Sequence, residues 1–178
     1  MKRILLVLVF AVILAAGAFA DHHPSGLGLG IIGRINVAWY EDLEDDTGAA
    51  ALSLKIPWVP IFWGASVEYK EHAFGLCLTG DYYLIDNSFV DNGKFGWYFG
   101  FGGYASYNAK EDEYGSWASI HLNVRVPIGI SFMPVRFFEI YVEAAPGMGI
   151  GVYLGEYSDK FRFPDGGFGF DMGLRFWF

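Results

Sequence analysis

Two pairs of side chains in this sequence have the types and spacing that acid–base or nucleophilic chemistry requires. Glu139 and Glu143 lie four residues apart, and an even spacing in a strand places both carboxylates on one face. Two carboxylates that share a site repel each other, which is one way in which enzymes obtain a general acid. Ser119 and His121 also share a face, as a nucleophile and its base would.

A structural role competes with each of these interpretations. Arg125, on a neighbouring segment, can neutralise both Glu139 and Glu143. A pair such as Ser119 and His121 needs access for a substrate, which an interior filled by side chains does not give. We therefore predict no catalytic residues and expect that the protein is not an enzyme.

Three further motifs contain residue types that bind nucleotides or metals, but the surrounding sequence does not support binding. Residues 28–33 match the dinucleotide fingerprint GxGxxG, yet a strand pattern follows them where the fingerprint needs a helix. His22 and His23 are a weak pair for a transition metal. An acidic run without EF-hand spacing favours a solvated surface loop over a cation site. The run comprises Glu41, Asp42, Glu44, Asp45 and Asp46. We predict neither a metal nor a cofactor.

The elements that must position these side chains are short segments of alternating polarity. Eight can be drawn, over residues 26–40, 48–56, 61–69, 73–84, 95–107, 116–131, 137–153 and 166–178. No later run of 18 apolar residues lacks charge, which excludes a bundle of membrane helices. The chain is nevertheless 53% hydrophobic, and a membrane strand needs only about ten alternating residues. The pattern predicts an all-β fold, an eight-stranded antiparallel up-and-down transmembrane β-barrel.

The N-terminal residues have the pattern of a secretory signal peptide. Lys2 and Arg3 precede an apolar stretch, and Ala18-Phe19-Ala20 forms a small-x-small cleavage site before Asp21. We predict a cleaved signal peptide over residues 1–20 and an outer-membrane barrel over residues 21–178. Loss of the two basic residues changes the net charge from −8 to −10, which argues against nucleic acid as a partner.

The face opposite the apolar one carries nearly balanced charge. An unpaired buried charge costs several kcal/mol, whereas a pair with added hydrogen bonds can be tolerated. We therefore predict a lumen filled by a paired network; a soluble barrel would have the reverse polarity. The predicted network comprises Arg34, Lys55, Glu68, Asp81, Arg125, Glu139, Glu143, Asp171 and Arg175.

The connectors predict the arrangement of the two ends. Segments 41–47, 70–72, 108–115 and 154–165 fall at one end, and segments 57–60, 85–94 and 132–136 fall at the other, beside both termini. Outer-membrane barrels keep their termini in the periplasm, so we expect both termini there. Pro127 and Pro146 lie inside predicted strands, where we expect β-bulges or strand ends.

The last segment, GGFGFDMGLRFWF, alternates aromatic residues with glycine and ends on phenylalanine. It resembles the signal that outer-membrane barrels present to the barrel-assembly machinery. The resemblance implies an assembly signal formed by Phe168, Phe170, Phe176 and Phe178.

The second half of the chain resembles an uncharacterised family of small bacterial β-barrel proteins, a domain of unknown function. The resemblance spans about residues 78–178 and rests on LTGDYYLI, GWYFGFGGYASY, VRVPIGISFMP, FEIYVEAAPGMGIG and GFDMGLRFWF. More broadly, the chain looks like the eight-stranded barrels of the OmpA transmembrane, OmpW and OmpX type. The resemblance implies a location in the bacterial outer membrane and this fold, and it brings no established catalytic residues.

These observations predict a small outer-membrane protein with a filled, charge-paired lumen, which acts as a structural or surface-exposed envelope protein through its loops. Two alternatives remain. One is a narrow passive channel for small or hydrophobic solutes; the other is an outer-membrane enzyme, which would need a groove exposing Ser119 with His121. Expected partners are outer-membrane lipid, the barrel-assembly machinery and cationic or divalent-ion-bridged surface molecules. We expect a monomer.

Overall fold

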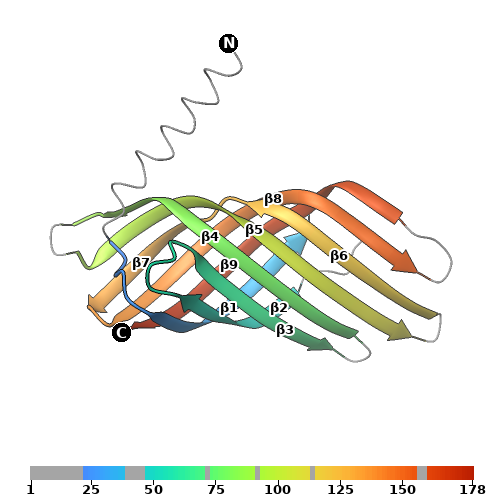
Figure 1. The fold of residues 1–178 in the computed structure, drawn as a ribbon, viewed down its shortest axis with the longest axis horizontal. Helices are drawn as coiled ribbons and strands as arrows, with labels where there is room; N and C mark the ends of the chain where they lie inside the picture. The colour runs from blue at the N-terminus through green and yellow to red at the C-terminus, as the bar shows by residue number, and fades with distance from the viewer. Residues whose placement is uncertain (1–21, 39–46, 71–72, 91–92, 113–114, 156–159) are drawn as a thin grey trace, which may run out of the picture.

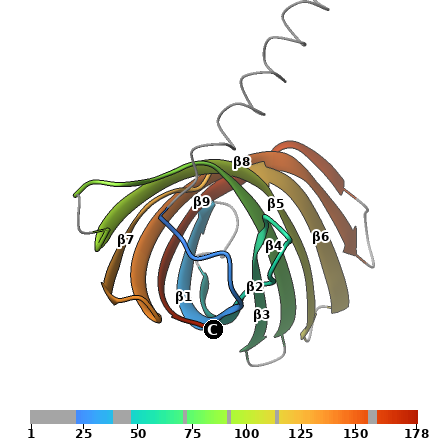
Figure 2. The ribbon, with the colours of Figure 1, turned by 60° about the vertical axis from the view of Figure 1, so that its left-hand side comes forward.

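The computed structural model describes residues 22–38, 47–70, 73–90, 93–112, 115–155 and 160–178. These residues form strands that close into a barrel (Figures 1 and 2). The strands are β1 (Gly28–Ala38), β2 (Thr47–Lys55), β3 (Phe62–Lys70), β4 (Ala73–Ser88), β5 (Phe95–Asp112), β6 (Gly115–Arg125), β7 (Ile128–Val135), β8 (Phe138–Gly155) and β9 (Lys160–Trp177). Every neighbouring pair is antiparallel, and the pairing of β1 with β9 joins the two ends of the chain.

The strands β6 and β7 are two halves of one barrel strand. Both pair with β5 on one side and with β8 on the other, so the barrel has eight strands, as predicted. Pro127 lies at the break between the halves, which confirms the strand end expected there. Val126 and Ile128 both face outward, so the break does not change which residues face the lumen.

The prediction of a bulge or strand end at Pro146 is wrong. Pro146 lies inside β8 and pairs with Phe168 without a change of register. The Pro146 carbonyl accepts a hydrogen bond from the Val126 N–H at 2.9 Å. In an antiparallel pair the N–H and C=O of one residue face the same neighbour. The proline nitrogen therefore faces the break after β6, where the ladder is already interrupted.

Two register shifts lengthen the barrel beyond the predicted segments. In β4 a shift between Tyr83 and Ile85 carries the strand on to Ser88, which shortens the predicted connector 85–94. Between β8 and β9 the register shifts between Gly149 and Gly151, where two β9 residues lie opposite Ile150, and β9 begins earlier than predicted at Lys160, which shortens the predicted connector 154–165. Each shift places an extra residue in one strand, so the residues beyond it change face.

The two faces of the sheet have the predicted polarity. Apolar side chains point outward and are exposed, for example Leu52 at 67%, Val124 at 69% and Met172 at 64%. Polar and charged side chains point inward and are buried. Inward glycines make room for large rings: a Cβ at Gly129 would lie 2.2 Å from the Tyr98 ring. No helix within the described residues is both long and apolar enough to span a membrane.

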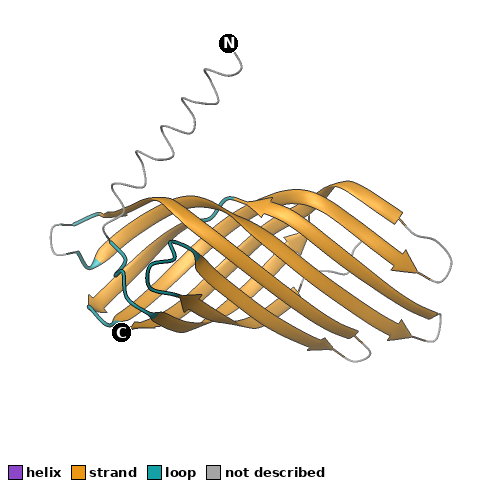
Figure 3. Ribbon diagram, in the orientation of Figure 1, coloured by secondary structure: helices purple, strands orange, loops and turns teal. Residues whose placement is uncertain are grey.

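The barrel has two distinct ends. The described connector residues 56–61, 89–90, 93–94 and 136–137 lie at the end that also holds residues 22–27 and the C-terminus, here called the terminal end (Figure 3). The opposite end, here called the loop end, is where β1, β3, β5 and β8 finish. In Figure 2 the segment of residues 22–27 crosses the mouth of the barrel at the terminal end.

Candidate functional site in the barrel lumen

Two arginines form the centre of the lumen. Arg34 donates to both oxygens of Asp171, from Nε at 2.7 Å and from Nη2 at 2.6 Å. Arg125 donates to Glu143, and its Nε lies 3.2 Å from an oxygen of Asp81. Asp171 also lies 3.6 Å from Arg125, so the two arginines share this carboxylate. Buried charges of opposite sign that are also hydrogen bonded can offset the cost of leaving water.

A third arginine pairs with a carboxylate nearer the terminal end. Arg175 donates to Glu139 at 2.9 Å, and the Trp177 indole N–H donates to the same oxygen at 2.9 Å. The Arg175 guanidinium lies 4.7 Å from the centre of the Tyr141 ring and 4.9 Å from that of Phe62. Such cation–π contacts contribute to the burial of this charge.

His23 inserts into the terminal end from outside the membrane-spanning strands. Its Nδ1 lies 2.8 Å from Asp86 and its Nε2 lies 2.8 Å from Glu139. Burial opposes protonation of the ring, but Glu139 and Asp86 outweigh it and raise the pKa of His23 to about 9. The ring is therefore an imidazolium at neutral pH, and both nitrogens donate. His23 thus acts as an ion-paired plug, whereas the sequence suggested only a weak metal ligand.

Aromatic rings pack tightly around this plug. Tyr83 stacks between Phe62 and Tyr98, with ring centres 4.2 Å apart on each side. Trp177 and Met133 complete this buried cluster. The terminal end is therefore filled by apolar rings and paired charges.

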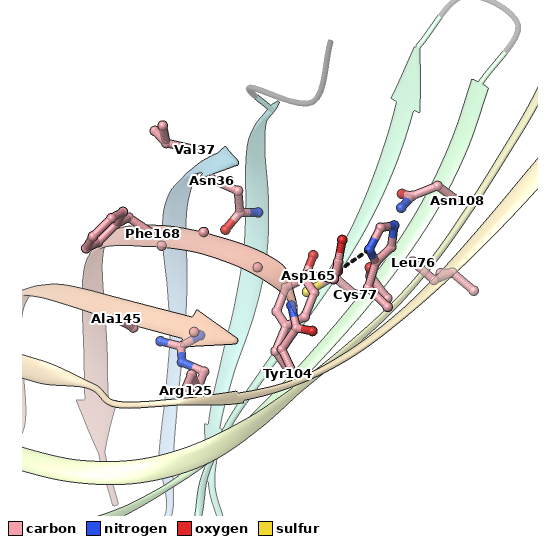
Figure 4. Close-up of a pocket in the computed structure, with 17 residues that line it drawn as sticks. Asn36, Val37, Leu76, Cys77, Tyr104, Asn108, Arg125, Ala145, Asp165 and Phe168 are labelled. Carbon is pink, nitrogen blue, oxygen red and sulfur yellow. Dashed lines mark hydrogen bonds and ion pairs between the residues drawn. The ribbon is translucent and has the colours of Figure 1, made fainter. Parts of the chain in front are cut away.

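The loop end holds a cavity of about 120 Å³ (Figure 4). Asn36, Asn108 and Asp165 reach its wall from β1, β5 and β9. Beside it, His121 lies 3.0 Å from the Ser119 hydroxyl through Nε2 and 2.8 Å from Asp165 through Nδ1. The structure thus adds a carboxylate to the Ser119 and His121 pair that the sequence placed on one face.

Lys55 belongs to the terminal end. It is buried there, its Nζ lies 5.7 Å from the centre of the Phe62 ring, and it donates to the carbonyl of Ile56 at 3.1 Å. The Glu68 side chain and the acidic run 41–46 lie outside the described residues, as does the predicted signal peptide. The phenylalanines of the predicted assembly signal all face outward on or just beyond β9. They are Phe168, Phe170, Phe176 and Phe178.

Sequence reasoning missed three lumen residues. Asp86 and Asp165 were assigned to connectors. A register shift in β4 turns Asp86 inward, whereas Asp165 continues the inward alternation of Asp171 and Arg175 because β9 begins earlier than predicted. The alternation of Phe161 and Phe163 with Arg162 was the available signal that β9 begins early. The insertion of His23 joins residues 116 positions apart, and no local pattern encodes it.

Of the comparisons with known proteins, only the search of solved structures finds similar proteins. No family model matches the chain, and a search of curated proteins finds no match. The chain is similar to the crystal structure of neisserial surface protein A (NspA), with a TM-score of 0.56 and 11% identity over 86% of this chain and 97% of the other. The chain has the fold of the small eight-stranded outer-membrane barrels.

A second solved structure has the same fold. Ail, the attachment invasion locus protein of Yersinia pestis, gives a TM-score of 0.51 with 10% identity over 86% of this chain and 97% of the other. At these identities the likenesses establish the fold and leave the biological role to be argued from the residues.

Proposed function

We propose that this protein resides in the bacterial outer membrane as a structural or surface-exposed envelope protein with a sealed lumen. The observation that carries the proposal is the polarity of the wall, which is apolar outside and paired charge inside. A soluble protein rarely exposes a contiguous apolar patch larger than a few hundred Å². Here the outward side chains along the middle of every strand are apolar, as a surface in contact with lipid must be.

The filled terminal end favours a sealed barrel over the alternative of a passive channel. A solute entering there would have to displace His23 from Asp86 and Glu139, and then pass the rings of Tyr83 and Tyr98. Further along, the shared pairs of Arg34 and Arg125 cross the lumen. Separating buried ion pairs leaves uncompensated charges, which is strongly unfavourable.

The ends support an orientation with both termini in the periplasm. Residues 22–27 and the C-terminus lie together at the terminal end, and the longest connector, residues 39–46, joins β1 to β2 at the opposite end, as a long extracellular loop would. The acidic run 41–46 connects β1 with β2 at the loop end, which this orientation places outside the cell. Its charge would favour cationic or divalent-ion-bridged partners, with an attraction that salt weakens.

Density-gradient fractionation of cells, combined with bilayer recordings of the purified protein, tests the proposal. We expect the protein in the outer-membrane fraction, folded as a heat-modifiable barrel, with no stepwise conductance. Recovery as a soluble periplasmic protein would refute the location. Defined single-channel steps would refute the sealed lumen and favour the passive channel.

A further inference from the structure

Ser119, His121 and Asp165 form a continuous hydrogen-bonded chain at the loop end. His121 Nε2 lies 3.0 Å from the Ser119 hydroxyl, and His121 Nδ1 lies 2.8 Å from an oxygen of Asp165. All three residues are buried against the lumen. A nucleophile within hydrogen-bond reach of a base, which is oriented in turn by a third group, is the arrangement that activates a serine.

The direction of these hydrogen bonds follows from the groups themselves. An ionised carboxylate only accepts, so the His121 Nδ1 carries a proton and donates to Asp165. In the neutral ring Nε2 then has a free lone pair, which accepts the hydroxyl proton of Ser119. This is the tautomer in which histidine can remove that proton.

The strands hold Asp165 in place for this contact. Tyr153 donates to its other oxygen at 3.2 Å, so both oxygens are engaged. On β8, Gly151 lies opposite His121, and a Cβ there would approach the Asp165 carboxylate to 3.0 Å. The glycine therefore leaves the space that the carboxylate occupies between β6 and β9.

His121 and Asn108, which both contact the Ser119 hydroxyl, line the cavity, whereas Ser119 itself is buried directly behind them. The Asn108 amide donates to the hydroxyl at 3.5 Å. This long contact is weak, so the amide is free to turn toward a negative oxygen that develops beside the serine. A volume of about 120 Å³ is several times the minimum that holds one water, so a small acyl group fits.

We propose that Ser119 is a nucleophile that hydrolyses carboxylic esters entering the loop-end cavity. The Ser119 oxygen attacks the ester carbonyl carbon while its proton passes to His121 Nε2. The intermediate collapses, Nε2 returns the proton to the departing alcohol, and the acyl group stays on Ser119. Water then attacks this acyl ester, its proton passes through Nε2 to the serine oxygen, and the carboxylic acid leaves.

The ester can belong to a soluble molecule, or it can be the bond that links an acyl chain to a membrane lipid. The cavity is lined mainly by polar side chains, among them Asn36, Asn108 and Asn123, with Cys77 and Ala145 as small apolar members. Val37, Leu76 and Phe168 also border it, but their side chains face outward (Figure 4). Such a lining suits the polar carbonyl of an ester that carries a short hydrocarbon group. The small volume favours short acyl groups. The proposal goes beyond the envelope role and does not depend on it, because the chemistry requires only the folded barrel.

Labelling of the purified, folded protein in detergent with a fluorophosphonate probe tests the nucleophile. We expect one covalent adduct, which peptide mapping assigns to Ser119, and its loss in Ser119→Ala. Ser131→Ala is the matched control because Ser131 is another buried lumen serine, on β7. Heat-modifiability on gels verifies that each variant is folded. An absent adduct, or an adduct that persists in folded Ser119→Ala, would overturn the proposal and leave a structural hydrogen-bond chain.

Hydrolysis assays identify the ester and the positioning role of Asp165. We expect turnover of p-nitrophenyl butyrate that exceeds turnover of p-nitrophenyl palmitate and of phosphatidylcholine vesicles; the reverse order would assign a lipid source. Asp165→Asn should lower kcat about 10²–10⁴-fold with little change in KM, and Asp165→Glu should restore part of the loss. Rates in folded Ser119→Ala equal to those of the unmodified protein would contradict the mechanism.

Discussion

The two ends of the lumen contain different kinds of side chains. At the terminal end, the rings of Phe62, Tyr83 and Tyr98 pack around His23, and charges are paired at hydrogen-bond distances. At the loop end, smaller polar side chains surround a cavity of about 120 Å³. The same eight strands therefore support a closed half, suited to stability and sealing, and a half with space for a ligand.

The arginines at the boundary between these halves should show the largest effect on stability. Arg125→Leu leaves Asp81 and Glu143 without their shared partner, at a cost of about 3–5 kcal/mol in the free energy of unfolding. Urea unfolding of the folded barrel in lipid measures this change, and bilayer recordings detect any entry of water and ions. Arg125→Lys, which keeps the charge, should lose less. Unchanged stability together with unchanged conductance would reject the central network.

The plug at the terminal end should give a pH-dependent contribution. The pKa of His23 is raised from 6.5 to about 9, so its stabilisation is complete below pH 6.5 and is lost as pH rises through about 9. The full contribution is on the order of 3 kcal/mol. His23→Ala should therefore be less stable at pH 6 and show a smaller decline between pH 6 and pH 9.5. Equal slopes in the two proteins would contradict the ion-paired plug.

The matched control for that experiment is the neighbouring histidine. His22 is held by Ser88 at 3.1 Å, and its pKa is lowered, chiefly by burial. His22→Ala should therefore retain the decline in stability between pH 6 and pH 9.5.

The two ends of β9 allow a comparison of outward phenylalanines in assembly. Phe178 is 76% exposed at the terminal end, and Phe161 is 68% exposed near the loop end. Phe178→Ser should reduce the yield of heat-modifiable, protease-resistant barrel while export continues, whereas Phe161→Ser should not. Equal yields from the two variants would count against an assembly signal at the C-terminus.

A smaller effect is expected from filling the space behind Asp165. Gly151→Ala places a methyl group 3.0 Å from that carboxylate, so Asp165 must shift from His121. Barrel stability should change by less than in Arg125→Leu, because the displaced group lies beside a cavity. Unfolding in urea measures stability, and the NMR shifts of the His121 ring report its contact with Asp165. Unaltered ring shifts would mean that Gly151 does not position the carboxylate.

Periodicity was sufficient to predict the eight strands and the polarity of their faces, because both depend on alternation along single segments. Periodicity failed at a register shift, at the boundary of a strand, and where the segment before β1 folds back into the lumen. Asp86 follows the register shift in β4, and Asp165 lies one residue before the predicted start of the last segment. His23 contacts Glu139, which is 116 positions away in the sequence. Alternation therefore predicted that charges line the inward face, whereas it gave no sign of the insertion of His23 or of the contact between Asp165 and His121.

The most direct test of the account is which end of the barrel is exposed on the outside of intact cells. An epitope tag inserted after Asp46 lies in the connector between β1 and β2 at the loop end. Antibody should bind this tag on intact cells, while a tag following Phe178 at the terminal end should need permeabilisation. Detection of the Asp46 tag only after the outer membrane is permeabilised would contradict the proposed barrel orientation.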